Sequence, residues 1–190
     1  MQLEWRCPLS DERYVSEFAW ERAILDRCPF HPEGGCGLEK LGSYPRVEPA
    51  GVRVARWWCP KQRASISLLP SFLAARLSGT LAAVEGVVAA VEAAAGIEAA
   101  VDIVRPPDTE DAVGVVCALR WIRRRVVAVR AALLAIATLM PERFSGVAPT
   151  LAAFRAALGR EHVLVLLREI AWRHLAALPV PLGLRARVAG

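Results

Sequence analysis

The sequence predicts a mainly α-helical protein with a small zinc-ribbon-like β module near its N-terminus. Glycine, proline and cysteine concentrate between residues 28 and 69, and Ala/Val/Leu-rich stretches with helical spacing follow from Pro70 onward. Of the 190 residues, 55% are hydrophobic and 23% charged, which excludes a disordered chain of low hydrophobicity and high charge. We expect four segments: a lead-in helix (1–27), the β module (28–69), a helix-turn-helix-like unit with one long helix (70–140), and a helical pair with a tail (141–190).

The lead-in segment is expected to contain one helix. Ser10 can cap its N-terminus, and Asp11 and Glu12 suit the positive end of the helix dipole. A roughly helical apolar stripe follows at Val15, Phe18, Ala19 and Leu25. This MQLEWRCPLSDER start lacks the apolar core of a signal peptide, and no apolar run reaches the roughly 18 uncharged residues of a spanning helix. We therefore expect a cytoplasmic protein.

The β module is predicted from alternation and turn residues. Residues 52–57 alternate with the period of a strand, and Pro49 and Gly51 indicate a turn between two strands. A third short strand is expected at 64–68. The module contains too little apolar material for a core of its own, so we expect a bound metal to contribute folding energy.

The remaining chain is expected to be helical. The predicted helices cover residues 78–95, 97–104, 108–140, 150–158 and 161–178, and the tail PVPLGLRARVAG is expected to be loose. Gly96 separates the first two helices, and Pro141 ends the long one. The long helix has apolar residues at alternating spacings of four and three, at Val115, Leu119, Ile122, Val126, Val129, Leu133, Ile136 and Met140. This heptad seam predicts either an intramolecular bundle or a homodimer through residues 115–140.

The cysteines indicate a metal site rather than disulfides, because five cysteines leave one unpaired and no signal peptide precedes them. A Pro/Gly-rich loop has the spacing C-x2-H-x4-C, and Cys59 follows the predicted hairpin. Our preferred ligand set for Zn²⁺ is Cys28, His31, Cys36 and Cys59. Cys7 is an alternative fourth ligand, since no second Cys or His follows Cys59. The competing interpretation is a decayed site whose cysteines are small buried hydrophobes. We expect Cys117 to lie in the core.

Two basic clusters are candidate nucleic-acid contacts. On the long helix, one side carries Arg120, Arg123, Arg124 and Arg130, whereas Arg125 points elsewhere. Such a stripe suits phosphates, and a solvated outer face that pairs with glutamates is the equally weighted alternative. In the β module, basic and aromatic residues interleave, and the predicted contacts there are Arg53, Arg56, Trp57 and Lys61. For at least one of the two adjacent tryptophans, packing against the helices is the favoured interpretation.

The order of these motifs resembles the N-terminal part of bacterial insertion-sequence transposases and a group of short proteins of similar layout. The matching motifs are CPFHPEGGCG, WWCP, SISLLPSFL and ALRWIRRR, over about residues 1–125. The resemblance implies a zinc ribbon before a helix-turn-helix, DNA binding linked to mobile elements, and a bacterial, nucleoid-associated location. No RNase-H-like catalytic domain follows the motifs, so it implies binding without strand transfer.

No catalytic set is recognisable in the sequence. There is no Gly-rich phosphate loop, and Ser43, Ser65 and Ser67 have no evident base. We expect a DNA-binding protein with a structural zinc ribbon, without enzymatic activity or an evident small-molecule substrate. The alternative is a zinc-clipped protein–protein interaction or assembly module that uses the long helix.

Overall fold

A computed structural model describes residues 1–94, 96–104, 112–185 and 187–188. The chain divides into two compact units, residues 1–80 with 184–190, and residues 81–183. The four segments expected from the sequence therefore do not form separate units. The lead-in, the β module and the end of the chain belong to one unit. We describe each unit by itself.

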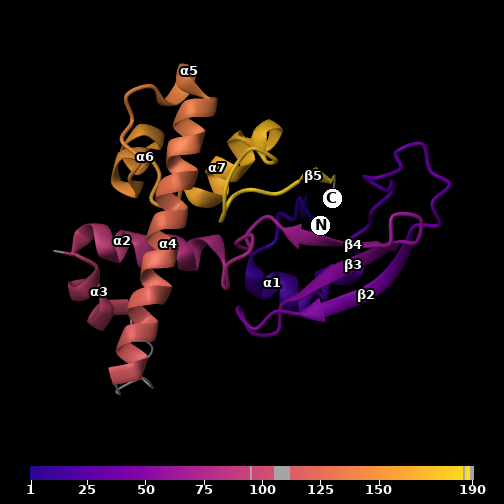
Figure 1. Ribbon diagram of the computed structural model, residues 1–190, viewed down its shortest axis with the longest axis horizontal. Helices are drawn as coiled ribbons and strands as arrows, with labels where there is room; N and C mark the ends of the chain where they lie inside the picture. Colours follow the sequence, from indigo (N-terminus) through magenta and orange to yellow (C-terminus); the bar gives the residue numbers. More distant parts are fainter. Residues whose placement is uncertain (95, 105–111, 186, 189–190) are drawn as a thin grey trace. The chain divides into compact units, whose positions relative to one another are not determined.

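The first unit contains, within the described residues, one five-stranded sheet in the order β2-β3-β4-β1-β5. The strands are β1 (Gln2–Trp5), β2 (Glu39–Pro45), β3 (Arg53–Cys59), β4 (Ala64–Pro70) and β5 (Arg187–Val188). Strands β2, β3 and β4 are antiparallel neighbours (Figure 1), and β1 runs parallel to both β4 and β5. The predicted hairpin and third strand are confirmed, and Gly51 in the hairpin turn has a positive φ of 79°.

The lead-in and the tail differ from expectation. The first residues form β1, and the helical part is limited to α1 (Asp11–Ser16) and the 3-10 helix η1 (Ala19–Glu21). The predicted loose tail contributes β5, and Leu184 is only 5% exposed. Both strands are short, and each pairs with residues far away in the sequence, so local patterns do not reveal them.

The lead-in supplies core residues to the β module, which was not predicted from the sequence. Leu3, Leu68 and Ala55 lie side by side on β1, β4 and β3 and are at most 1% exposed. Tyr14 of α1 is fully buried, and its ring contacts Trp5, which shares this face with Leu3. We call this side of the sheet the Leu3 face.

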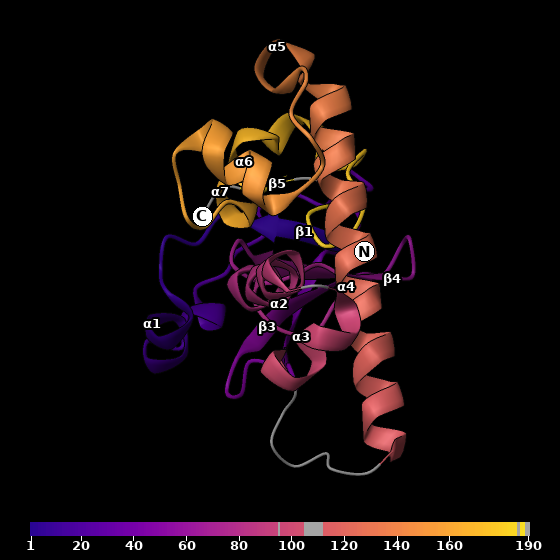
Figure 2. The same cartoon turned by 90° about the vertical axis from the view of Figure 1, so that its left-hand side faces the viewer.

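The second unit is helical. Its helices are α2 (Leu81–Ala93), α3 (Ile97–Val104), α4 (Ala112–Leu139), α5 (Pro141–Phe144), α6 (Leu151–Leu158), α7 (Leu164–Ile170) and the 3-10 helix η2 (Trp172–His174). The long helix is confirmed, although its expected start at Asp108, Glu110 and Asp111 lies outside the described residues. The single helix expected over 161–178 is α7 followed by η2. Figure 2 shows α4 upright, with α2 and α3 beside its lower half and α5 at its upper end.

The heptad seam of α4 is buried inside this unit. Its central residues, Ile122, Val126, Val129, Leu133 and Ile136, are at most 3% exposed, and α4 packs against α2, α3 and α5. A homodimer through residues 115–140 would have to displace these contacts, and it stays a prediction. The expectation that Cys117 lies in the core is wrong. Cys117 is exposed, because it follows the seam residue Val115 by two positions and therefore lies on the other side of the helix. Among the described helices, none is long and apolar enough to cross a membrane.

Candidate metal centre and basic surfaces

Four predicted ligands converge at one end of the sheet. Cys28, His31 and Cys36 come from the loop before β2, and Cys59 is the last residue of β3. Their ligand atoms all lie within 4.8 Å of one another. Figure 1 shows this loop beyond the β3–β4 turn. The three cysteines are 0 to 6% exposed and His31 is half-buried, so the cluster is largely shielded from solvent.

The distances within the cluster suit a tetrahedral ion. His31 Nδ1 lies 3.6 Å from Cys28 Sγ and 3.4 Å from Cys59 Sγ. With a metal–sulfur bond of about 2.3 Å and a metal–nitrogen bond of about 2.0 Å, tetrahedral geometry separates sulfur and nitrogen by about 3.5 Å. Three sulfurs and one imidazole nitrogen at this spacing form a closed donor set for a soft or borderline metal.

Tight backbone turns hold the ligands in place. The His31 amide donates to the Cys28 carbonyl at 3.1 Å, and Gly34 then donates to the His31 carbonyl at 3.0 Å. After Cys59, the chain lacks the second ligand of a regular knuckle. There the Gln62 amide donates to Cys59 Sγ at 3.4 Å, a contact that stabilises negative charge on the sulfur.

Electrostatics within the cluster favour a bound cation. Burial raises the pKa of Cys28, but hydrogen bonds from His31, the Phe30 amide and Cys59 outweigh burial and lower this pKa to about 7. Burial, followed by the neighbouring sulfurs of Cys28 and Cys59, raises the pKa of Cys36. Three sulfurs so close together repel one another as thiolates, and a metal cation at their centre would remove that repulsion.

The alternative fourth ligand does not join the group. Cys7 is buried, and burial raises the pKa of its thiol, but it is not one of the four clustered residues. Cys59 therefore completes the candidate metal centre. This is the set that the sequence favoured from loop spacing and from the position of Cys59 after the hairpin, and the structure decides between Cys59 and the alternative Cys7.

The predicted arginine stripe lies on the exposed side of α4. Arg120, Arg123, Arg124 and Arg130 are all exposed, and we call them the arginine face. Arg123 pairs with the exposed Glu98 of α3 at 3.1 Å. Arg125 is 3% exposed, and its guanidinium lies 3.5 Å from the ring centre of Trp121, so it does point elsewhere.

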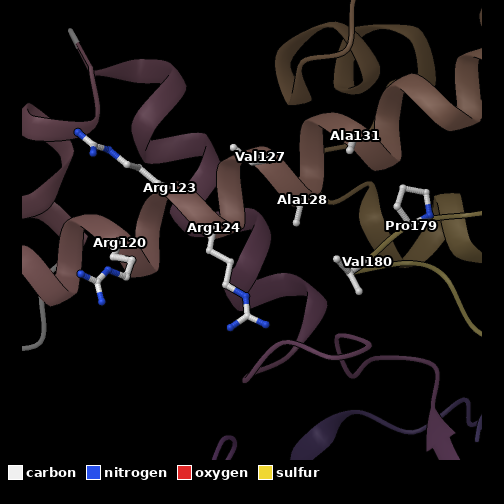
Figure 3. A pocket seen from close by; sticks show the side chains of 8 residues that line it. All are labelled: Arg120, Arg123, Arg124, Val127, Ala128, Ala131, Pro179 and Val180. Atoms are coloured by element: carbon white, nitrogen blue, oxygen red, sulfur yellow. The ribbon is translucent and has the colours of Figure 1, made fainter.

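A groove of about 520 Å³ adjoins the arginine face. In Figure 3, Arg120, Arg123 and Arg124 extend from α4 beside Val127, Ala128 and Ala131, with Pro179 and Val180 opposite. The three guanidinium groups point in different directions and away from the apolar residues. The surface thus combines separate cationic groups with an apolar strip.

The basic residues of the β module divide between the two sides of the sheet. Side chains alternate along a strand, so Arg53, Trp57 and Cys59 share the Leu3 face, whereas Arg56 and Trp58 lie on the other. Arg53 is held by Ser43, to whose Oγ it donates at 2.9 Å. Arg56 and Lys61 are exposed. Of the predicted contacts, Arg56 and Lys61 are therefore available to a partner, and Arg53 has an internal role.

Trp57 and Trp58 are both half-buried, and they lie on opposite sides of β3. Trp57 is half-buried on the Leu3 face, and its buried Nε1 has no hydrogen-bond partner among the described residues. Trp58 shares its side of the sheet with the exposed Arg56. The sequence already indicated that Arg56 and Trp58 share one side of β3, because side chains two residues apart in a strand point the same way.

Comparisons of this chain with protein-family models, with curated proteins and with solved structures find no match.

Proposed function

We propose that this protein binds DNA and that a structural zinc ion stabilises its N-terminal unit. In this proposal the chain is related to transposase-type DNA-recognition proteins. The arginine face of α4 carries the DNA-binding part, because four exposed guanidinium groups lie within 11 residues of one helix.

The zinc assignment is supported by the donor set. Three thiolates and one histidine are a common ligand combination for structural zinc, and all four positions are filled by protein atoms. A metal site with no open coordination position links segments of the chain and does not activate water. The metal would tie the loop before β2 to the end of β3.

DNA binding is supported by positively charged side chains that form few ion pairs within the described part of the helical unit. Arg120, Arg124 and Arg130 have no ion-pair partner within the described residues, and the one partner of Arg123 is exposed. Exposed ion pairs contribute little to stability, so Glu98 can be displaced by a phosphate. Each guanidinium offers a planar donor fork that suits phosphate oxygens.

The order α2, α3 and α4 supports a helix-turn-helix arrangement in part. Helix α2 ends at Ala93 and α3 begins at Ile97, a short separation in sequence that is typical of this motif. However, α3 carries Glu98, which disfavours it as the helix that enters a DNA groove. We therefore assign the DNA contact to α4, and the helix-turn-helix stays a prediction.

The test is the affinity of the zinc-loaded chain for a labelled duplex of random sequence, measured by fluorescence anisotropy across a salt series. The double variant Arg123→Ala/Arg124→Ala should weaken binding and lower the slope of log K against log [salt] by about 1.8, since each neutralised phosphate contributes about 0.9. The matched control removes two exposed arginines elsewhere in the same unit, Arg143→Ala/Arg160→Ala, and should keep the slope. An equal effect of both variants would contradict the assignment to α4.

The second candidate function is a protein–protein assembly module. It is favoured by the apolar residues exposed along α4, since Val127 is 68% and Leu134 57% exposed. No duplex binding at low salt, together with a concentration-dependent mass in sedimentation, would favour this function. A monomer that binds DNA would exclude it as the main role.

A further inference from the structure

We propose that the side of the sheet opposite the Leu3 face binds single-stranded DNA, with Trp58 as the residue on which an unpaired base stacks. This inference rests on the proposed DNA binding and adds a second site with a different strand preference. We call the surface the Arg56 face, defined by Gln2, Arg56, Trp58, Ser65 and Ser67.

Register places these residues in two rows across the sheet. Arg56 of β3 lies opposite Ser67 of β4, which lies opposite Gln2 of β1. The next row joins Trp58 to Ser65. Arg56 and Trp58 are two residues apart, or about 7 Å along the strand. A cation and an aromatic ring therefore stand side by side on the same surface.

Three neighbours of these two side chains are small. Ser65 and Ser67 flank them on β4, and Arg56 donates to Ser65 Oγ at 3.3 Å. On the β2 side the neighbour of Arg56 is Gly42, where an added Cβ would meet no atom within 4 Å. The surface around Arg56 is thus open, and Trp58 beside it is half-buried, which leaves part of its side chain accessible for stacking on a base.

Further positive charge borders the Arg56 face. The Arg185 amide donates to the Gln2 carbonyl at 3.1 Å, which places the exposed Arg185 next to Gln2 at the end of the Arg56 row. Burial first, and then Arg185, Arg76 and Arg56, lower the pKa of the Met1 amino group, so these three charges lie near the same corner. The exposed β3–β4 turn adds Lys61 and Arg63.

Two carboxylates on this side of the sheet oppose the positive charge, the buried Glu4 of β1 and the exposed Glu39. Glu39 of β2 lies directly opposite Trp58 and is exposed. Arg56, Arg76 and Arg185 have no ion-pair partner among the residues that the structure describes. The net charge around Trp58 is therefore positive. Glu39 is the residue that would repel a phosphate and so limit its affinity.

The geometry favours a single strand over a duplex. In a duplex both faces of each base are covered by neighbouring bases, so a tryptophan on a sheet cannot reach them. An unpaired base can lie on Trp58 while its phosphates contact Arg56 and Arg185. Stacking is tolerant of sequence, because every base has a π-face.

The experiment uses the full zinc-loaded chain and three labelled probes: a 20-nucleotide oligothymidylate, an abasic strand of the same length, and a 20-base-pair duplex. Wild type should bind the oligothymidylate more tightly than the abasic strand. Trp58→Ala should weaken oligothymidylate binding roughly 5- to 150-fold, the range for one stacked base, and should make the two single strands equal. Trp58→Phe should restore most of the difference.

Controls separate stacking from charge and from folding. Trp57→Phe changes the tryptophan of the opposite side and should preserve the preference for bases. Arg56→Gln/Arg185→Gln should lower the salt slope for the oligothymidylate by about 1.4, and Glu39→Gln should raise the affinity. Retained zinc and far-UV circular dichroism identify folded variants, and the arginine pair tests the surface even if Trp58→Ala does not fold.

The outcomes distinguish this inference from the proposed function. Equal binding of oligothymidylate and abasic strand by wild type overturns the stacking role, even where duplex binding through α4 holds. Loss of single-strand binding in Trp58→Ala with unchanged duplex binding supports the inference. Single-strand binding that depends on Trp58, with a duplex slope that Arg123→Ala/Arg124→Ala leaves unchanged, would support this site and remove α4 from DNA binding.

Discussion

At the scale of single residues, Tyr14 connects α1 to the sheet. Its side chain is fully buried, and its hydroxyl donates to the Arg53 carbonyl at 2.8 Å. Its ring also contacts Trp5, Trp20 and Phe72. One side chain thus satisfies a backbone acceptor and fills the space between the lead-in and the strands.

We predict that Tyr14→Phe lowers the free energy of unfolding of the first unit by about 1 kcal/mol at pH 7, because the Arg53 carbonyl loses its donor. Burial raises the pKa of Tyr14 above its usual value near 10. The unfolded chain therefore loses this proton first, so the stability from Tyr14 is complete below pH 10 and declines above it.

Urea unfolding at pH 7 and pH 10.5 measures both effects. The variant should lose less stability than wild type between these two values. Tyr44→Phe, a half-buried tyrosine of β2, is the control. An equal decline in Tyr14→Phe and wild type would show that another group is responsible.

At the scale of elements, α2 supports two later helices through glutamates that are two turns apart. Glu85 accepts from the Val163 and Leu164 amides at the start of α7, which has no side-chain cap of its own. Glu92 accepts from the Leu151 and Ala152 amides at the start of α6. Negative charge at a helix N-terminus is favourable because the free amides and the helix dipole point toward it.

We predict that Glu85→Ala destabilises the helical unit by about 3 kcal/mol, because Glu85 is 1% exposed and also pairs with Arg155 at 3.0 Å. Glu92→Ala should cost about 1 kcal/mol, since Glu92 is half-buried and Thr150 also caps α6. Thermal unfolding followed by circular dichroism compares the two variants. A larger loss in Glu92→Ala would contradict this ranking.

At the scale of the whole molecule, the proposed metal should matter for one unit and not for the other. The four ligands all belong to the first unit, whereas the second has a helical core of its own. The tryptophans report on them separately: Trp5, Trp20, Trp57 and Trp58 lie in the first unit, Trp121 and Trp172 in the second.

We predict that a zinc chelator changes tryptophan fluorescence, by unfolding the loop and strands around the site, while most helical circular dichroism remains. Metal binding and folding are coupled in such modules, with about 10–16 kcal/mol of apparent binding energy in zinc-finger peptides. Added zinc should reverse the change. Cys28→Ser should reproduce it and Cys7→Ser should not, with metal content measured by mass spectrometry. Simultaneous loss of the helical signal would contradict independent units.

Several features of the fold and the site could be predicted from the sequence because their signals are local. The spacing of Cys28, His31 and Cys36 and the hairpin before Cys59 favoured these four residues as ligands. The spacing of four and three was sufficient to identify α4 and its buried side. These patterns follow from the geometry of one turn, one hairpin or one helix.

Other features depended on partners distant in sequence. Strand β1 exists because it pairs with β4 and β5, more than 60 residues away, and α7 begins where Glu85 of α2 meets its amides. The period of two already separates Arg56 and Trp58 from Trp57, but the residues that lie beside each of them were known only from the register of β3 with its neighbours.

The sequence alone thus predicted the three candidate metal ligands of the loop, the hairpin and the long amphipathic helix, since each is set by contacts between near neighbours in the chain, whereas the choice of Cys59 over Cys7 as the fourth ligand required the structure. Only the tertiary structure decided that the seam of α4 packs within its own unit, that the lead-in supplies core residues to the β module, and which residues surround Arg56 and Trp58 on their side of the sheet. The physical reason is that burial depends on which distant segment covers a surface, and periodicity shows that a face is apolar but not what packs against it.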